Sequence, residues 1–108
     1  MPHSECSVVF LTVPDQKTAD AIAAVLLDRK LAACVAITPG VQSRYWWQGK
    51  RETATELALT AKTLTALLPA LIKAVKAVHP YEVPEIVAVP ITAGNPDYLK
   101  WIADSCTQ

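Results

Sequence analysis

The sequence predicts an α+β domain in which helices cover one face of a single antiparallel sheet. Strand-like and helix-like stretches follow one another in the order β-α-β-β-α-β, and one more helix closes the chain. The 108 residues are 52% hydrophobic, which suffices for one compact core and argues against a disordered segment. No linker or low-complexity stretch divides the chain, so we interpret residues 1–108 as a single domain.

The first strand and the first helix are predicted by residues 7–30. Residues 7–13 are β-branched and apolar, as in a buried strand. Pro14 ends this run, and Asp15 is a good helix N-cap. The helix is expected to end near Lys30, and apolar residues repeat along it at helical spacing, namely Ala19, Ile22, Ala23 and Leu26.

A long hairpin is predicted next. Residues 31–37 form its first strand, which Pro39-Gly40 interrupts as a bend or bulge would. After a turn at residues 48–50, residues 52–62 alternate between two faces. Each arm is about twice as long as the typical strand of ~5–6 residues. One face carries Glu56, Ala58, Thr60 and Lys62, and the other carries Leu57, Leu59 and Ala61.

The second half supplies a helix, a strand and a final helix. Thr65 is a plausible N-cap for the helix, and Pro80 ends it at His79. Residues 85–91 are almost continuously apolar, which predicts a central strand covered on both faces. Asn95-Pro96 opens the last helix. The apolar faces expected for the two helices are Leu68, Leu71, Ile72 and Val75, then Tyr98, Trp101 and Ile102. This order matches the ferredoxin-like split βαβ arrangement.

Composition excludes several classes of function. Ten Lys and Arg balance ten Asp and Glu, whereas a nucleic-acid-binding protein normally carries a basic excess. We see no basic n-region of a signal peptide and no apolar run of the ~20 residues that a membrane span needs. Three cysteines without CxxC spacing predict neither a disulfide framework nor a zinc ribbon. We therefore expect a cytoplasmic protein with no nucleic-acid or membrane partner.

The hairpin carries Tyr45, Trp46 and Trp47 near its tip. Consecutive strand residues face opposite sides, so Trp46 and Trp47 cannot both pack on one core. An isolated two-stranded ribbon is marginal in water. We expect neighbouring subunits to cover these three residues, with a ribbon that folds back on its own sheet as the alternative.

The stretch VHPYEVPEI joins the second long helix to the next strand. His79 is interpreted either as a helix cap at the negative end of the dipole or as a metal or ligand contact, since imidazole binds copper and zinc. Tyr81, Glu82 and Glu85 follow on a segment stiffened by prolines, as in a small-molecule site, and we expect them with His79 to rim a pocket between subunits. Alternatively, the glutamates are solvated or pair with cations across an interface.

Three further residues are candidates for contacts. Glu56 and Lys62 share a strand face but lie about 20 Å apart by strand rise. Each therefore needs a partner elsewhere, either in the same chain or on another subunit. Lys62 lies near a helix start that favours anions. Cys34 is interpreted as a small hydrophobe in the middle of a buried strand, with a metal role as the alternative. We treat Cys6, Cys106 and His3, all near the chain ends, as incidental.

Several stretches together resemble the CutA family of divalent-cation tolerance proteins. They are LAACV at 31–35, Ser43-x-Tyr45-x-Trp47-x-Gly49-Lys50, HPYEVPEI at 79–86 and Tyr98-Leu99-x-Trp101. The resemblance runs from about Val8 to Trp101. It implies a ferredoxin-like subunit and a homotrimer similar to PII-type signalling proteins. It also implies a role in tolerance of divalent metals, with copper binding attributed to some members.

One departure from the family bears on copper. The ligands proposed in some bacterial relatives match Leu11, Val78 and His79 here, and only His79 can donate a lone pair to a metal. We expect weak copper binding and no required cofactor. The leading hypothesis is a non-enzymatic trimeric binding protein. The alternative is a PII-like module for a small anion or nucleotide, although no glycine-rich phosphate loop is present. No catalytic residue is predicted, because nothing orients a Cys34–His79 pair.

Overall fold

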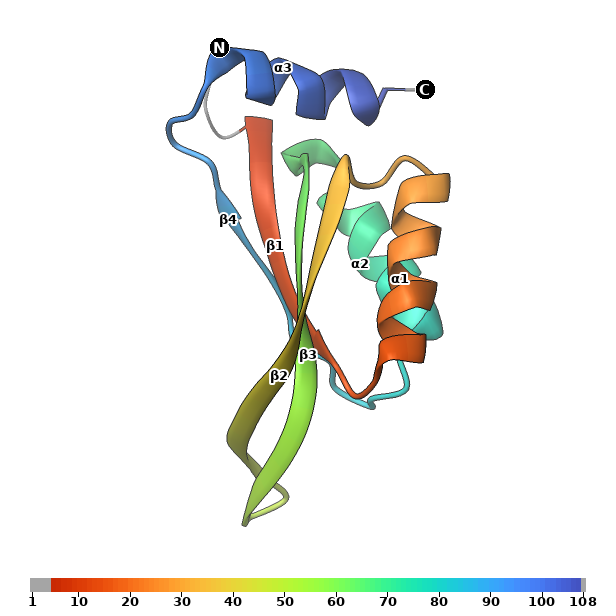
Figure 1. The fold of residues 1–108 in the computed structure, drawn as a ribbon, viewed down its shortest axis with the longest axis vertical. Helices are drawn as coiled ribbons and strands as arrows, with labels where there is room; N and C mark the ends of the chain where they lie inside the picture. The colour runs from red at the N-terminus through yellow and green to blue at the C-terminus, as the bar shows by residue number, and fades with distance from the viewer. Residues whose placement is uncertain (1–4, 108) are drawn as a thin grey trace.

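The sheet has four strands in the order β2-β3-β1-β4, and every neighbouring pair is antiparallel. This computed structural model describes residues 5–107. Helices α1 and α2 lie against one face of the sheet, and α3 crosses the end at which β1 begins (Figure 1). The arrangement confirms the predicted α+β, ferredoxin-like fold. The elements are β1 (Cys6–Val13), α1 (Gln16–Asp28), β2 (Cys34–Trp47), β3 (Lys50–Leu64), η2 (Thr65–Leu67), α2 (Leu68–Val78), β4 (Ile86–Pro90) and α3 (Pro96–Ser105).

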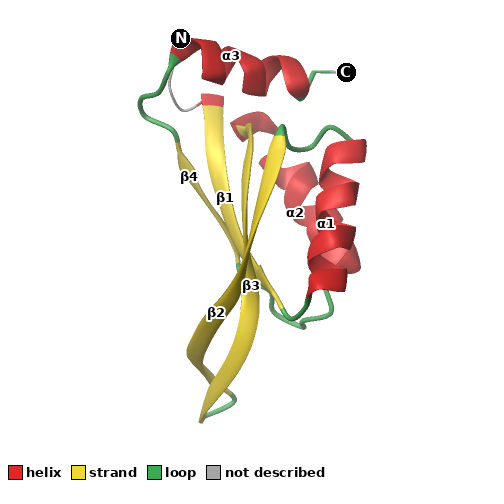
Figure 2. Cartoon of the chain, in the orientation of Figure 1, coloured by secondary structure: helices red, strands yellow, loops and turns green. Residues whose placement is uncertain are grey.

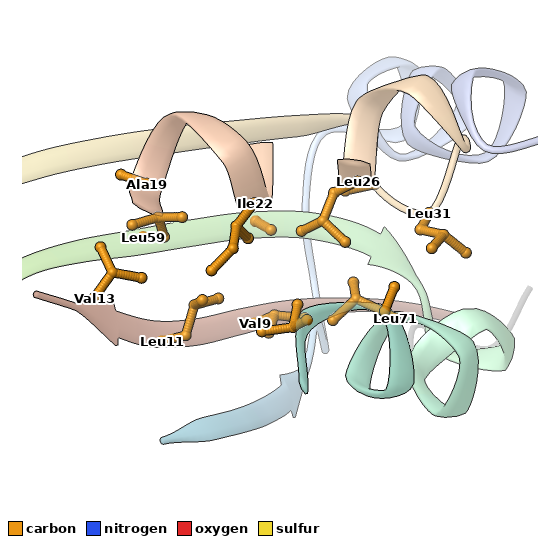
Figure 3. Close-up of a cluster of buried hydrophobic side chains, with 13 residues drawn as sticks. Val9, Leu11, Val13, Ala19, Ile22, Leu26, Leu31, Leu59 and Leu71 are labelled. Atoms are coloured by element: carbon orange, nitrogen blue, oxygen red, sulfur yellow. The ribbon is translucent and has the colours of Figure 1, made fainter. Parts of the chain in front are cut away.

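The core lies between one sheet face and helices α1 and α2. Alternate residues of β1 and β3 point into it, and the apolar side of each helix packs on them (Figure 3). The alternate residues of these strands point to the other sheet face, which α1 and α2 do not cover. The fully buried core side chains include Val9, Leu11, Val13, Ile22, Leu26, Leu59, Leu71 and Val75.

Two of the predicted helix caps are confirmed. The Asp15 carboxylate accepts a hydrogen bond from the Thr18 backbone N–H at 2.8 Å. This bond lowers the pKa of Asp15 from its ordinary value, because it favours the ionised form. Asn95 caps α3 in the same way, through the Asp97 N–H at 3.0 Å. Local sequence therefore decides where α1 and α3 begin.

Strands β2 and β3 continue past the sheet as a two-stranded ribbon (Figure 2). Their register shifts between Thr38 and Val41, which confirms the irregularity predicted at Pro39-Gly40. At the tip, Gln48 and Gly49 have φ of 49° and 79°, as a two-residue type I′ turn requires. The ribbon extends away from the sheet, so the alternative of a hairpin folded back on it is wrong.

Strand β4 corrects the prediction for residues 85–91. It is an edge strand that pairs only with β1, not a central strand covered on both faces. Val87 and Val89 are 53% and 47% exposed. The run is apolar on both sides because one side meets the core and the other belongs to the uncovered sheet face. Sequence alone could not separate an uncovered apolar face from a buried one.

Other predicted details also differ. Thr65 does not cap α2, since it begins η2 and its hydroxyl lies 2.7 Å from the Ser7 hydroxyl. Strand β2 begins at Cys34, after the buried Leu31 and Ala32. On α2 it is Ala74, and not Ile72, that is buried. On α3 only Ile102 is buried, while the exposed Tyr98 and Trp101 stack on each other.

The tip turn predicts that Gly49→Ala destabilises the protein by about 1–2 kcal/mol, because a Cβ is strained at positive φ even where no neighbour is near. Gly94→Ala is the matched control. Its φ is not positive, and an added Cβ would meet the Leu99 side chain at an ordinary 3.4 Å. Denaturant midpoints should fall for the first variant only. Equal midpoints would contradict the type I′ turn.

Candidate functional site

A groove of about 820 Å³ lies where the ribbon leaves the sheet. One side is formed by the ribbon and the other by the segment that joins α2 to β4. It brings together most of the residues that the sequence singled out, although they come from separate parts of the chain. Those residues are Tyr45, Trp46, Trp47, Glu56, Tyr81, Glu82 and Glu85. Sequence reasoning did not find Thr12, Ser43, Arg44 and Val83, which also line it.

His79 lies behind the groove and does not line it. Its Nε2 donates to the Thr12 backbone oxygen at 2.8 Å, and its Nδ1 accepts the Tyr81 backbone N–H at 3.1 Å. The ring is therefore neutral with its proton on Nε2. His79 is buried, and it is the C-cap residue of α2, but its ring bonds a strand carbonyl rather than the helix's own carbonyls. A metal on His79 would have to displace one of these two backbone partners.

Tyr81 and Glu56 form the inner end of the groove. The Tyr81 hydroxyl donates to Glu56 Oε2 at 2.6 Å, and Glu56 is only 5% exposed. Burial, followed by the hydrogen bond to Glu56 and its negative charge, raises the pKa of Tyr81 well above its ordinary value. The phenol therefore keeps its proton and remains a hydrogen-bond donor to Glu56.

Glu56 has no cation beside it in the described chain. Among residues 5–107, the ion pair found joins Lys100 to Asp104 on the surface of α3. Lys62, the other predicted polar residue on the Glu56 face of β3, does not line the groove. It faces Val8 and Cys34 across the neighbouring strands. The predicted site residues therefore lie in two separate places, with Glu56 in the groove and Lys62 beside Val8 and Cys34.

Cys34 corrects a prediction. It is the first residue of β2 and is half-buried, whereas the sequence suggested the middle of a buried strand. Its Sγ lies 3.6 Å from the Tyr98 hydroxyl, and this contact raises the pKa of Tyr98. Cys6 and Cys106 are buried free thiols, and His3 lies outside the described residues.

A complete metal site is absent from the described part of a single subunit. No three His, Cys, Asp or Glu side chains within residues 5–107 are grouped so as to hold a metal ion. Leu11, which matches a proposed copper ligand, is in the core, and Val78 is exposed at the end of α2. Within the same residues, each helix is too short or too polar to span a membrane.

Comparison with known proteins gives one consistent family. Residues 7–105 match the family model described as CutA1 divalent ion tolerance protein. The divalent-cation tolerance protein CutA of Thermus thermophilus is 50% identical over 98 residues, which cover 91% of this chain and 95% of that protein. The chloroplastic protein CutA 1 of Oryza sativa is 48% identical over 98 residues, covering 91% of this chain. This chain spans 55% of the rice protein's length.

A solved structure agrees. The crystal structure of CutA from Xylella fastidiosa superposes with a TM-score of 0.93 at 42% identity, covering 96% of this chain and all of that chain. The similarity thus includes the ribbon as well as the helix-covered part of the sheet.

The Tyr81–Glu56 contact predicts a late-titrating tyrosine. In alkaline titrations followed by tyrosinate absorbance, Tyr81 should ionise above the ordinary tyrosine pKa of about 10. Glu56→Gln removes the adjacent charge and should lower that pKa, although burial still raises it. The Tyr81→Phe variant shows which part of the absorbance change comes from Tyr81, because that part is missing from its titration curve. Circular dichroism checks that each sample stays folded. An unchanged titration in Glu56→Gln would show that the contact is not formed in solution.

Proposed function

Because this chain belongs to the CutA1 divalent ion tolerance family, we propose that it is a non-enzymatic homotrimer that binds cations in the tolerance of divalent metals. The observation that carries this proposal is the groove with its enclosed carboxylate, Glu56, and two exposed carboxylates, Glu82 and Glu85. Three carboxylates against one guanidinium, that of Arg44, leave the lining negative. A negative groove favours a positive ligand.

Assembly into a homotrimer is supported by the exposed Tyr45, Trp46 and Trp47 of the ribbon, which we expect neighbouring subunits to cover, and by the uncovered face of the sheet. Phe10 lies opposite Val87 in the register, and Val8 lies opposite Val89, so apolar side chains adjoin one another there. Large apolar patches of this kind are usually covered by a partner. A second copy fits because the chain has no net charge to oppose self-association. We propose three copies because the family resemblance implies a homotrimer similar to PII-type signalling proteins.

Metal binding is proposed to be weak. Glu82 and Glu85 supply oxygen ligands at the groove mouth, but divalent cations need several ligands at once. The soft ligands that copper prefers are not available there, since Cys34 lies away from the groove and both His79 nitrogens already have partners. Copper or another divalent metal therefore binds as a readily exchanged ion, and no cofactor is required.

The alternative, a PII-like signalling module for a small anion or nucleotide, has one observation in its favour. Arg44 lines the groove and could meet an anion. The three carboxylates oppose it, so we prefer a cationic ligand. Catalysis through Cys34 and His79 is not supported, because His79 uses both ring nitrogens on backbone groups. The three free thiols fit a reducing, cytoplasmic location.

Sedimentation equilibrium tests the assembly. The purified protein should sediment as a trimer, and Val87→Lys should shift it toward monomer, because a charge would be buried at the proposed interface. Leu27→Lys, on the exposed side of α1, is the matched control and should leave the trimer intact. A monomeric wild type would overturn the trimer. A trimer that persists in Val87→Lys would place the interface elsewhere.

Calorimetric titration of the metal-free protein with Cu(I), Cu(II) and Zn(II) tests the metal proposal. We expect weak binding that the double change Glu82→Gln and Glu85→Gln reduces further, because it removes both exposed charges. Cys34→Ser should change little. A tight stoichiometric copper site that Cys34→Ser abolishes would show that the thiol, and not the groove, holds the metal.

A further inference from the structure

We propose that the inner end of the groove binds a small organic ammonium ion, held between Glu56 and the aromatic side chains of the ribbon. The inference shares its groove with the proposed function. It concerns a different ligand and a different part of that groove, namely the inner end rather than the exposed carboxylates at the mouth.

The first argument is the unbalanced charge of Glu56. Only 5% of the Glu56 residue is exposed, and no Lys, Arg or His among residues 5–107 forms an ion pair with its carboxylate. One oxygen accepts the Tyr81 hydroxyl, and Glu56 also lines the groove. A phenol is a neutral donor and cannot compensate a charge. Enclosing an ionised carboxylate without a cation is unfavourable, so a positive group placed in the groove gains affinity from this site.

The second argument is the character of the walls. The strand register places Ser43, Tyr45 and Trp47 on the same ribbon face as Glu56. Their cross-strand partners are Ala54, Glu52 and Lys50, which lie two, four and six residues before Glu56 on β3. Aromatic faces attract cations whose water shell is easily lost, and the attraction grows as the site is desolvated. Tyr45 and Trp47 therefore suit an alkylated nitrogen beside the carboxylate.

The same walls discriminate between cations. Calcium and magnesium need six or more oxygen ligands or retain their waters, and zinc needs about four ligands, whereas aromatic side chains supply no such ligands. An organic ammonium ion needs one strong acceptor and otherwise apolar contact. The volume of about 820 Å³ is that of a small-molecule site. The negative lining also disfavours carboxylate and phosphate ligands.

The test is calorimetric titration of the intact assembled protein with n-butylammonium chloride. Two probes of similar size are compared with it, neutral n-butanol and anionic n-butyrate. We expect only the ammonium ion to bind measurably. Failure of n-butylammonium to bind, equal binding of n-butanol, or preferred binding of n-butyrate would each overturn the proposal.

Variants locate the site. Glu56→Gln keeps an oxygen that accepts from Tyr81 but removes the charge, and should weaken n-butylammonium binding about tenfold or more. Tyr45→Leu, at an exposed position, should weaken it several-fold and remains informative if Glu56→Gln does not fold. Asp28→Asn is the matched control, because Asp28 is an exposed carboxylate at the end of α1 and does not line the groove. Unchanged affinity in Tyr45→Leu, or in a folded Glu56→Gln, would overturn the assignment.

Two further results distinguish ammonium binding from an ion pair between subunits and from the proposed metal binding. If n-butylammonium does not bind and Glu56→Gln dissociates the assembly, the cation is a side chain of a neighbouring subunit and the proposal fails. Metal titration and sedimentation of the wild type report on the proposed function independently. Either proposal can therefore fail while the other stands.

Discussion

The hydrogen bonds of His79 are the constraint on which the candidate site depends. One ring connects the end of β1, through Thr12, with the start of the segment after α2, through Tyr81. Each bond lost from a buried polar group costs about 1–3 kcal/mol, so the segment is held firmly against β1. Because Tyr81 is fixed in this way, its hydroxyl reaches Glu56 on β3. Three elements thus meet at one point, and the groove is open beside it.

The two faces of the sheet are covered differently, and this difference favours association with other chains. Helices α1 and α2 cover the core residues on one face, while Phe10, Val87 and Val89 leave the other face apolar and exposed. Strands β2 and β4 are both edges, and exposed edges invite pairing with other chains. The register shift near Gly40 interrupts the β2 edge and limits where such pairing can occur. A subunit with these features is suited to a defined assembly and poorly suited to remaining alone.

Local chemistry decided what could be predicted from the sequence. Alternation gave the long ribbon, and side-chain caps gave the starts of α1 and α3, because each depends on residues close together in the chain. The contacts that build the site, in contrast, join residues that are far apart in the chain. Thr12 and His79 are 67 residues apart, and Glu56 and Tyr81 are 25 residues apart. No local sequence pattern therefore predicts either contact. The edge position of β4 was missed for a related reason, since hydropathy does not say which apolar face has a partner.

The hydrogen bonds of His79 also affect which side chains of this protein are available to bind a cation. In this chain the histidine that survives from the proposed copper ligands is occupied by backbone, and the groove offers carboxylates and aromatic rings instead. Carboxylates at an open mouth hold hydrated ions loosely, because water competes and screens the charge. An enclosed carboxylate acts in a lower dielectric, where the same charge attracts more strongly. The two proposals therefore place two kinds of cation recognition in one groove, and they are separated by how enclosed the carboxylates are rather than by the identity of the acidic residues.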